Sequence, residues 1–311
     1  MSGFGFVTNH AHSLNGTLPT AAIERPSEFT VKFWGVRGSI PTSGIETARF
    51  GGNTPCVEMQ VGGKRLVFDG GTGLRVLGKH LLCEMPVQAH IFFTHTHWDR
   101  IQGFPFFAPA FIEGNQFDVY GAIGANGASI KQRLSDQMLR PNFPVSIQAM
   151  RSQLRFHDVA PGSIIRLDDV VIETIALNRP NGALGYRVTW NGCAVVYATD
   201  TDPSLGHLDQ GLLYLANQAD LLIYDIARPD HIPYLQGSAD GEQPLPWKTG
   251  AEVAIAAEAK QIALFHHDPD HEDDFLEQME AELQAWLPKV QFAREGLAIQ
   301  LFSKSSSVAN G

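Results

Sequence analysis

Two histidines and an aspartate stand at alternating positions in the stretch "HTHWDR", residues 95–100. They follow the apolar run "IFF", so a loop at the end of a buried strand could aim His95, His97 and Asp99 at one point. Imidazole and carboxylate groups are ligands for zinc, iron or manganese. The next residue, Arg100, cannot bind a metal, because its guanidinium stays protonated and has no lone pair to offer. The stretch indicates a metal site, an altered metal site, or histidines that are simply satisfied in the core.

Further side chains of the ligand type come at the ends of other predicted strands. Asp69 ends "RLVFD", Asp200 ends "AVVYATD", and His266 and His267 follow "QIALF". One His-x-His would be weak support by itself, since alternate residues of any strand share a face. Because four separate strands deliver such residues, we predict that they meet at one rim of a sheet and form a site there.

Short strands and helices alternate along the chain in a pattern that predicts two sheets flanked by helices. Gly62-Gly63 and Asn191-Gly192 each join two apolar runs, as expected of tight hairpins. The predicted strands cover residues 29–36, 56–61, 65–69, 90–93, 117–121, 163–167, 170–177, 186–190, 193–200, 221–226, 261–265 and 297–302. The predicted helices cover 73–82, 128–139, 206–218, 250–260 and 271–287, the second of them stopping at Pro141. No Gly-x-Gly-x-x-Gly separates a strand from a helix, so we do not predict a dinucleotide-binding sheet.

Composition and charge narrow the class of protein. The 311 residues include 33 Asp and Glu against 23 Lys and Arg, a net charge of −10, which argues against a global nucleic-acid or anionic-membrane binder. The sequence shows no secretory signal and no apolar run of about 20 residues. The three cysteines are scattered, as in a reducing compartment. We therefore expect a cytoplasmic protein with a flexible leader over 1–27, one domain over 28–303 and a disordered tail over 304–311.

Several stretches stand out over about residues 29–302, namely "FWGVRGSIP", "RFGGNTPCVEM", "LVFDGGTGLR", "IFFTHTHWDRIQGFPFF", "NFPV", "LGYRV", "VVYATDTD" and "LFHHDPDHEDD". Together they resemble the metallo-β-lactamase-fold hydrolases, above all the branch with tRNA 3′-processing endonucleases and cyclic-nucleotide phosphodiesterases. The resemblance implies an α/β protein with an αββα sandwich of two mixed sheets flanked by helices. It also implies a two-metal site on one edge of the sandwich.

The resemblance assigns the family's first ligands to the opening stretch. The motif His-x-His-x-Asp-His falls on His95, His97, Asp99 and Arg100. The aspartate that bridges the two metals in the family falls on Asp200. Position 100 is therefore a departure from the family pattern.

The remaining family positions include further departures. The last ligand falls on His266, with His267 as the alternative. A family histidine that precedes a proline falls on Arg179, and another histidine near the site falls on Lys248. Asp69 matches a position that supports the ligand loop and binds no metal.

Each metal of the family arrangement would thus lose one protein ligand. One metal would keep His95, His97 and Asp200, and the other would keep Asp99, His266 and Asp200. The arginines also add positive charge to the pocket, which makes a second divalent cation harder to hold. We predict at most one metal, zinc or else manganese or iron, and the sequence also allows none.

The first functional hypothesis is a hydrolase of the phosphodiesterase type with an altered site. A single metal on the first set of ligands would lower the pKa of water. Asp99 would orient or deprotonate that water, while Arg100, Arg179 and Lys248 would hold the phosphate. The alternative use of Arg100 and Arg179 is to fill the metal volume and pair with the carboxylates left behind.

The second hypothesis is a catalytically inactive protein that binds an anionic or nucleotide ligand as a sensor or scaffold. In both cases the expected partner is a small anionic or phosphodiester ligand. We expect no membrane partner and no nucleic-acid partner, and the sequence leaves a homodimer open.

Overall fold

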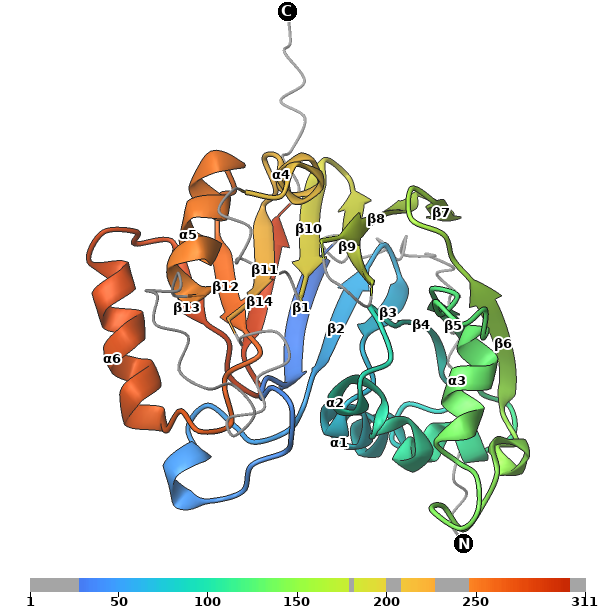
Figure 1. Ribbon diagram of the computed structural model, residues 1–311. Helices are drawn as coiled ribbons and strands as arrows, with labels where there is room; N and C mark the ends of the chain where they lie inside the picture. Colours follow the sequence, from blue (N-terminus) through green and yellow to red (C-terminus); the bar gives the residue numbers. More distant parts are fainter. Residues whose placement is uncertain (1–27, 179–181, 200–207, 227–245, 303–311) are drawn as a thin grey trace, which may run out of the picture.

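The computed structural model describes residues 28–178, 182–199, 208–226 and 246–302. Within these residues, two seven-stranded sheets pack face to face, and helices cover the outer face of each sheet (Figure 1). The αββα sandwich predicted from the sequence is therefore confirmed. The predicted leader and tail lie outside the described residues.

The first sheet carries most of the N-terminal half of the chain. Its strand order is β14-β1-β2-β3-β4-β5-β6. Neighbours from β14 to β3 are antiparallel, whereas β3, β4, β5 and β6 run parallel to one another. The bounds are β1 Glu28–Gly35, β2 Cys56–Val61, β3 Lys64–Phe68, β4 Gln88–Phe92, β5 Gln116–Gly121, β6 Gln153–Asp158 and β14 Ala298–Phe302.

The second sheet carries the C-terminal half and is also mixed. Its order is β13-β12-β11-β10-β9-β8-β7, antiparallel from β7 to β10 and parallel from β10 to β13. The bounds are β7 Ile164–Leu167, β8 Val170–Leu177, β9 Ala183–Trp190, β10 Cys193–Ala198, β11 Leu221–Asp225, β12 Ile262–Phe265 and β13 Val290–Phe292. Each sheet thus has a parallel part, and the carboxyl ends of parallel strands are where ligand sites form in such sheets.

The two hairpins predicted from glycine pairs are present. Asn191 and Gly192 both have positive φ, 48° and 74°, between the paired residues Trp190 and Cys193. Gly62 and Gly63 turn β2 into β3 in the same way, with φ of 54° and 72°. A turn with left-handed residues at both central positions matches the twist of the flanking strands, and glycine and asparagine adopt this conformation most readily.

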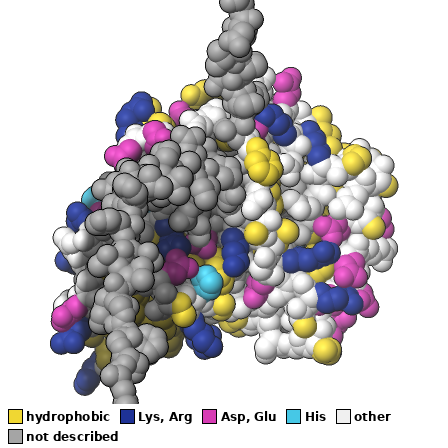
Figure 2. Space-filling model, turned by 180° about the vertical axis from the view of Figure 1, so that it is seen from behind, with side chains coloured by type: hydrophobic (Ala, Val, Ile, Leu, Met, Phe, Trp, Pro, Cys, Tyr) yellow, Lys and Arg dark blue, Asp and Glu magenta, His cyan; other side chains and the backbone are white. Residues whose placement is uncertain are grey.

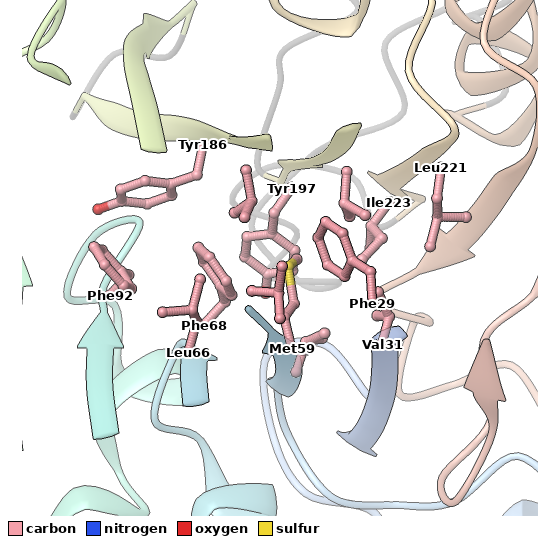
Figure 3. Packing of buried hydrophobic residues seen from close by; sticks show 14 of the residues in the cluster. Phe29, Val31, Met59, Leu66, Phe68, Phe92, Tyr186, Tyr197, Leu221 and Ile223 are labelled. Carbon is pink, nitrogen blue, oxygen red and sulfur yellow. The ribbon is translucent and has the colours of Figure 1, made fainter. Parts of the chain in front are cut away.

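The main core fills the space between the sheets. Figure 3 shows Leu66, Phe68 and Phe92 of the first sheet facing Tyr186 and Tyr197 of the second. These side chains are buried. Alternate residues of each strand face this core, while the others face the helices, as the period of two in a strand requires.

Two further cores lie under the helices. The first sheet packs against α1 and α3 through residues such as Leu74, Leu77 and Leu134. The second sheet packs against α4, α5 and α6 through residues such as Leu212 and Leu276. The bounds are α1 Thr72–Leu81, α2 Trp98–Ile101, α3 Ile130–Asp136, α4 Gln210–Ala216, α5 Pro246–Ala256 and α6 Asp273–Gln284, and the 3₁₀ helices are η1 Ile45–Thr47, η2 Phe104–Phe106, η3 Ala108–Phe111 and η4 Ile147–Ala149.

Some elements differ from the sequence prediction. β6 and β13 were not predicted, β6 because its residues mix polar and apolar types and β13 because it has three residues. α3 ends at Asp136 and not near residue 139. The backbone amides of Met138 and Leu139 donate to the carbonyl oxygens of Ser135 and Asp136, three residues back, as in a turn and not as in an α-helix. α5 begins four residues earlier than predicted, at Pro246.

The surface of the described part carries charges of both signs. Figure 2 shows basic and acidic side chains interspersed on the face opposite to that of Figure 1, with histidine and hydrophobic side chains beside them. Among the described residues, no helix has the length and apolar character needed to cross a membrane.

The loop after β3 and the segment after α2 approach each other without room for a side chain. A Cβ built on Gly103 would lie 1.8 Å from the carbonyl oxygen of Gly71, and one on Gly71 would lie 2.4 Å from the carbonyl oxygen of Asp99. Gly103 has an ordinary helical φ of −84°, so its requirement for glycine is steric.

We predict that Gly103→Ala lowers the free energy of unfolding by about 1 to 3 kcal/mol, because backbone must shift to admit the methyl group. Chemical denaturation followed by circular dichroism measures this. Gly211→Ala in α4 is the control, since its Cβ would meet no backbone atom closer than 3.9 Å and no side chain closer than 3.2 Å, and alanine favours a helix. If the Gly103→Ala variant and the wild type were equally stable, the backbone of Gly71 would not lie as close to Gly103 as described.

Candidate active site

The candidate site lies where parallel strands of both sheets end. Asp69 follows β3, His95 follows β4, Asp225 ends β11 and His266 follows β12. Asp69 and His266 have left-handed backbone conformations, with φ of 60° and 64°. Non-glycine residues rarely adopt this conformation, and such strained positions often belong to functional sites.

The segment after β4 presents the two histidines. His97 precedes α2 in an extended conformation, with φ −61° and ψ 155°, and its carbonyl accepts a hydrogen bond from the amide of Arg100. The rings of His95 and His97 lie edge to face, with centroids 4.5 Å apart. The Thr94 hydroxyl lies 3.0 Å from Nδ1 of His95, so a metal bound by His95 would use Nε2.

Asp69 anchors the segment after β4 through hydrogen bonds to Thr94. Asp69 is fully buried. Its Oδ1 accepts hydrogen bonds from the backbone amide of Thr94 at 2.9 Å and from the Thr94 hydroxyl at 3.0 Å. Its Oδ2 accepts the hydroxyl of Tyr197 at 2.9 Å. Burial raises the pKa of Asp69, against the opposing effect of Arg100. The supporting role that the resemblance implied for Asp69 is therefore consistent with these contacts.

Arg100 is completely buried and surrounded by carboxylates. Its Nη1 donates to Oδ2 of Asp69 at 3.1 Å, and its Nη2 donates to Oδ2 of Asp225 at 3.2 Å. Its Nε lies 3.3 Å from Oδ2 of Asp99. A guanidinium can only be buried with such compensation, because its desolvation is costly.

His266 connects two of the same carboxylates. Its Nε2 lies 2.8 Å from Oδ2 of Asp99, and its Nδ1 lies 2.8 Å from Oδ2 of Asp225. Burial and the nearby Arg100 lower the pKa of His266, but Asp225 and Asp99 outweigh them and raise it to about 9. The imidazole is therefore held as a cation between two carboxylates.

His267 faces away from this cluster. Its Nε2 lies 2.7 Å from the carbonyl oxygen of Ala293, and burial lowers the pKa of its ring to about 3. Of the two alternatives for the last ligand, the structure brings His266 to Asp99 and places His267 in a structural contact.

Arg37 fixes the loop that follows His266 and was not singled out by the sequence analysis. It is fully buried, and its Nη1 donates to the carbonyl oxygens of Asp268 and His271 at 3.1 and 2.7 Å. Its own backbone forms a bridge with His267. An arginine in the conspicuous stretch "VRGSI" was a visible hint, but Asp268 and His271 are more than 230 positions away in the sequence.

The predicted site residues are partly brought together. His95 and His97 form one pair, and Asp99, Arg100 and His266 form a connected cluster. The predictions for Arg179 and Asp200 lie outside the described residues. Lys248 is exposed in the first turn of α5, a helix that packs against β11 and β12.

Asp225 is the member of the cluster that the sequence analysis missed. It ends the apolar run "LLIYD", just as Asp69 ends "RLVFD". An acidic residue at the end of a buried strand was therefore a usable signal. Its importance depends on β11 lying next to β12 in the sheet, which brings it to His266.

The described side chains do not fit a two-metal centre. No group of three or more His, Cys, Asp or Glu within the described ranges is placed to hold a metal ion. The two metal positions of the family arrangement correspond to two sides of the site, one with Asp99 and His266 and the other with His95 and His97. On the Asp99–His266 side, the guanidinium of Arg100 lies against the carboxylates that would be ligands. On the other side the described residues supply two imidazoles, and the third predicted ligand, Asp200, lies outside the described ranges.

Comparisons with known proteins agree with this fold. The family model described as beta-lactamase superfamily domain matches residues 64–267. This match covers more than half of the chain, so the chain belongs to the beta-lactamase superfamily. No protein of curated function matches the sequence.

Solved structures show the same fold at low sequence identity. The metallo-β-lactamase-fold protein YhfI from Bacillus subtilis is 18% identical, with a TM-score of 0.63 over 88% of this chain and 100% of that chain. A diphosphatase of the PhnP family is 18% identical, with a TM-score of 0.62 over 88% and 98%. The short form of human tRNase Z is 17% identical, with a TM-score of 0.58 over 87% and 98%. The predicted resemblance to metallo-β-lactamase-fold proteins is thereby confirmed.

We predict that Arg100→Met lowers the free energy of unfolding by about 3 to 5 kcal/mol, because it leaves buried carboxylates without their cation. Urea denaturation followed by circular dichroism measures the change. Arg151→Met is the matched control, since Arg151 and its ion-pair partner Glu113 are both exposed. Surface pairs contribute little, so the control should change stability much less. Similar changes in both variants would contradict the compensating role of the three carboxylates.

Proposed function

We propose that this protein is a hydrolase of the phosphodiesterase type with an altered site. In this proposal the His95–His97 side is the reactive side, and any metal, zinc or else manganese or iron, is confined to it. The Asp99–His266 side holds Arg100 in place of a metal. Membership of the superfamily supports the hydrolase class, and the similar folds of a diphosphatase and of a tRNase support a phosphate ester as substrate.

The observation that carries the proposal is the asymmetry between the two sides. On one side, a buried guanidinium is engaged by Asp69, Asp99 and Asp225. On the other side, the imidazoles of His95 and His97 meet at the end of β4, and His97 is partly exposed. His97 is more accessible than the buried Arg100, so the proposal places the substrate beside this pair of histidines.

The chain's own residues suggest roles that do not depend on a second metal. Asp99 lies beside the positively charged groups of Arg100 and His266, which keep its carboxylate oriented. In the proposal this carboxylate orients the attacking water, and Arg179 and Lys248 supply positive charge for the phosphate. Because three carboxylates engage Arg100, we assign it a positioning role and not direct contact with phosphate.

We expect protein purified without chelator to hydrolyse a phosphodiester such as bis(p-nitrophenyl) phosphate or a cyclic nucleotide. Zinc, manganese and iron content, measured by plasma mass spectrometry, should reach at most about one equivalent per chain. His95→Ala/His97→Ala should abolish both metal and turnover. His80→Ala is the control, because His80 is exposed on α1 and should change neither.

Two results would contradict this function. Turnover that survives in the His95/His97 double variant would place the chemistry elsewhere. Absence of turnover with any of the three metals, together with thermal stabilisation by a nucleotide or inorganic phosphate, would favour a non-catalytic sensor or scaffold that binds an anionic ligand.

A further inference from the structure

Three carboxylates contact the guanidinium of Arg100, and one imidazole bridges two of them. Asp69, Asp99 and Asp225 each contact it through Oδ2, at 3.1, 3.3 and 3.2 Å. His266 reaches the same Oδ2 atoms of Asp99 and Asp225, both at 2.8 Å. Three carboxylates and one imidazole around one point form a donor set that elsewhere would hold a divalent cation.

The spacing of this set suits a guanidinium and not a metal ion. Carboxylate oxygens bind zinc at about 2.0 to 2.2 Å from the ion. Here they lie 3.1 to 3.3 Å from three different nitrogens, which spread around the central carbon of the guanidinium. A metal could be bound only after the guanidinium had left and the donors had moved inward.

We infer that Arg100 is a built-in cation that takes the place of the second metal and excludes divalent ions from this side. It positions Asp99, and Asp225 is its necessary counterpart, because Asp225 connects the guanidinium to His266. This inference deepens the proposed function by explaining how one side of the site stays assembled without a metal. Its test does not require turnover.

The alternative is that Arg100 only neutralises buried carboxylates and that the cluster has no capacity for a metal. The two views differ when the guanidinium is removed. A latent metal site should bind a divalent ion once the arginine is gone, whereas a purely structural ion cluster should only lose stability.

The experiment uses full-length protein carrying His95→Ala/His97→Ala, so that the other side cannot contribute metal. Into this parent we introduce Arg100→Ala, and Arg151→Ala as the surface control. After dialysis against zinc or cobalt, bound metal is measured by plasma mass spectrometry. The visible absorption of cobalt reports whether nitrogen and oxygen ligands surround it, and melting temperatures are recorded with and without zinc.

We expect the parent and the Arg151 control to retain less than about a tenth of an equivalent of metal, and the Arg100→Ala protein to retain about one. Zinc should raise the melting temperature of the Arg100→Ala protein and leave that of the parent unchanged. Adding Asp225→Asn to the Arg100→Ala protein should weaken metal retention at least about tenfold. Losses of this size follow when a metal ligand, or a residue hydrogen-bonded to a ligand, is removed.

Several results would overturn the inference. The parent could retain an equivalent of metal that His266→Ala removes, which would show that Arg100 does not exclude metal. The Arg100→Ala protein could fold and retain none, or fail to fold even with zinc or cobalt present. Arg100→Gln is a second variant that fills more of the space left by the arginine. If it folds and retains no metal, or fails to fold with zinc or cobalt present, the result also counts against the inference. If the wild type did not hydrolyse phosphodiesters, the proposed function would be overturned, but these metal measurements would be unaffected.

Discussion

Arg100 brings a full positive charge into the interior at the edge where both sheets end, and three carboxylates compensate it. Two of these carboxylates come from strands of different sheets, because Asp69 follows β3 of the first sheet and Asp225 ends β11 of the second, whereas Asp99 lies in α2. The guanidinium therefore joins the two sheets at the site. Through Asp225 and Asp99 it also determines the surroundings of His266, whose imidazole bridges them.

The parallel strands make this convergence possible, and close packing keeps it in place. Four parallel strands in each sheet point their carboxyl ends toward the same edge. Gly71 and Gly103 let the loop after β3 approach the segment after α2, and Arg37 fixes the loop after His266 by binding its carbonyl oxygens. The site is thus held by backbone contacts as well as by charge, which is the pre-organisation that electrostatic catalysis or anion recognition needs.

Much of the fold was predictable because apolar runs, glycine pairs and strand lengths are local properties of the sequence. β6 was missed because its side chains face a polar region on one side, as Asp118 and His157 show with their contact at 2.8 Å. The histidines after β4 already indicated a candidate site there, and Arg100 was visible as a departure from the pattern of the similar sequences. The partners of Arg100 were only partly predictable, since the contact with Asp225 depends on strand order and joins residues 125 positions apart. Whether an arginine faces a ligand or pairs with carboxylates is decided by such tertiary contacts.

The most direct test of the account is where a metal binds in crystals of the native protein. Anomalous diffraction from crystals soaked in zinc would locate the ion without any assay of activity. The account predicts either one peak beside His95 and His97 or none at the site, with Arg100 still bound to its three carboxylates. A zinc peak between Asp99 and His266, with the guanidinium displaced, would contradict it.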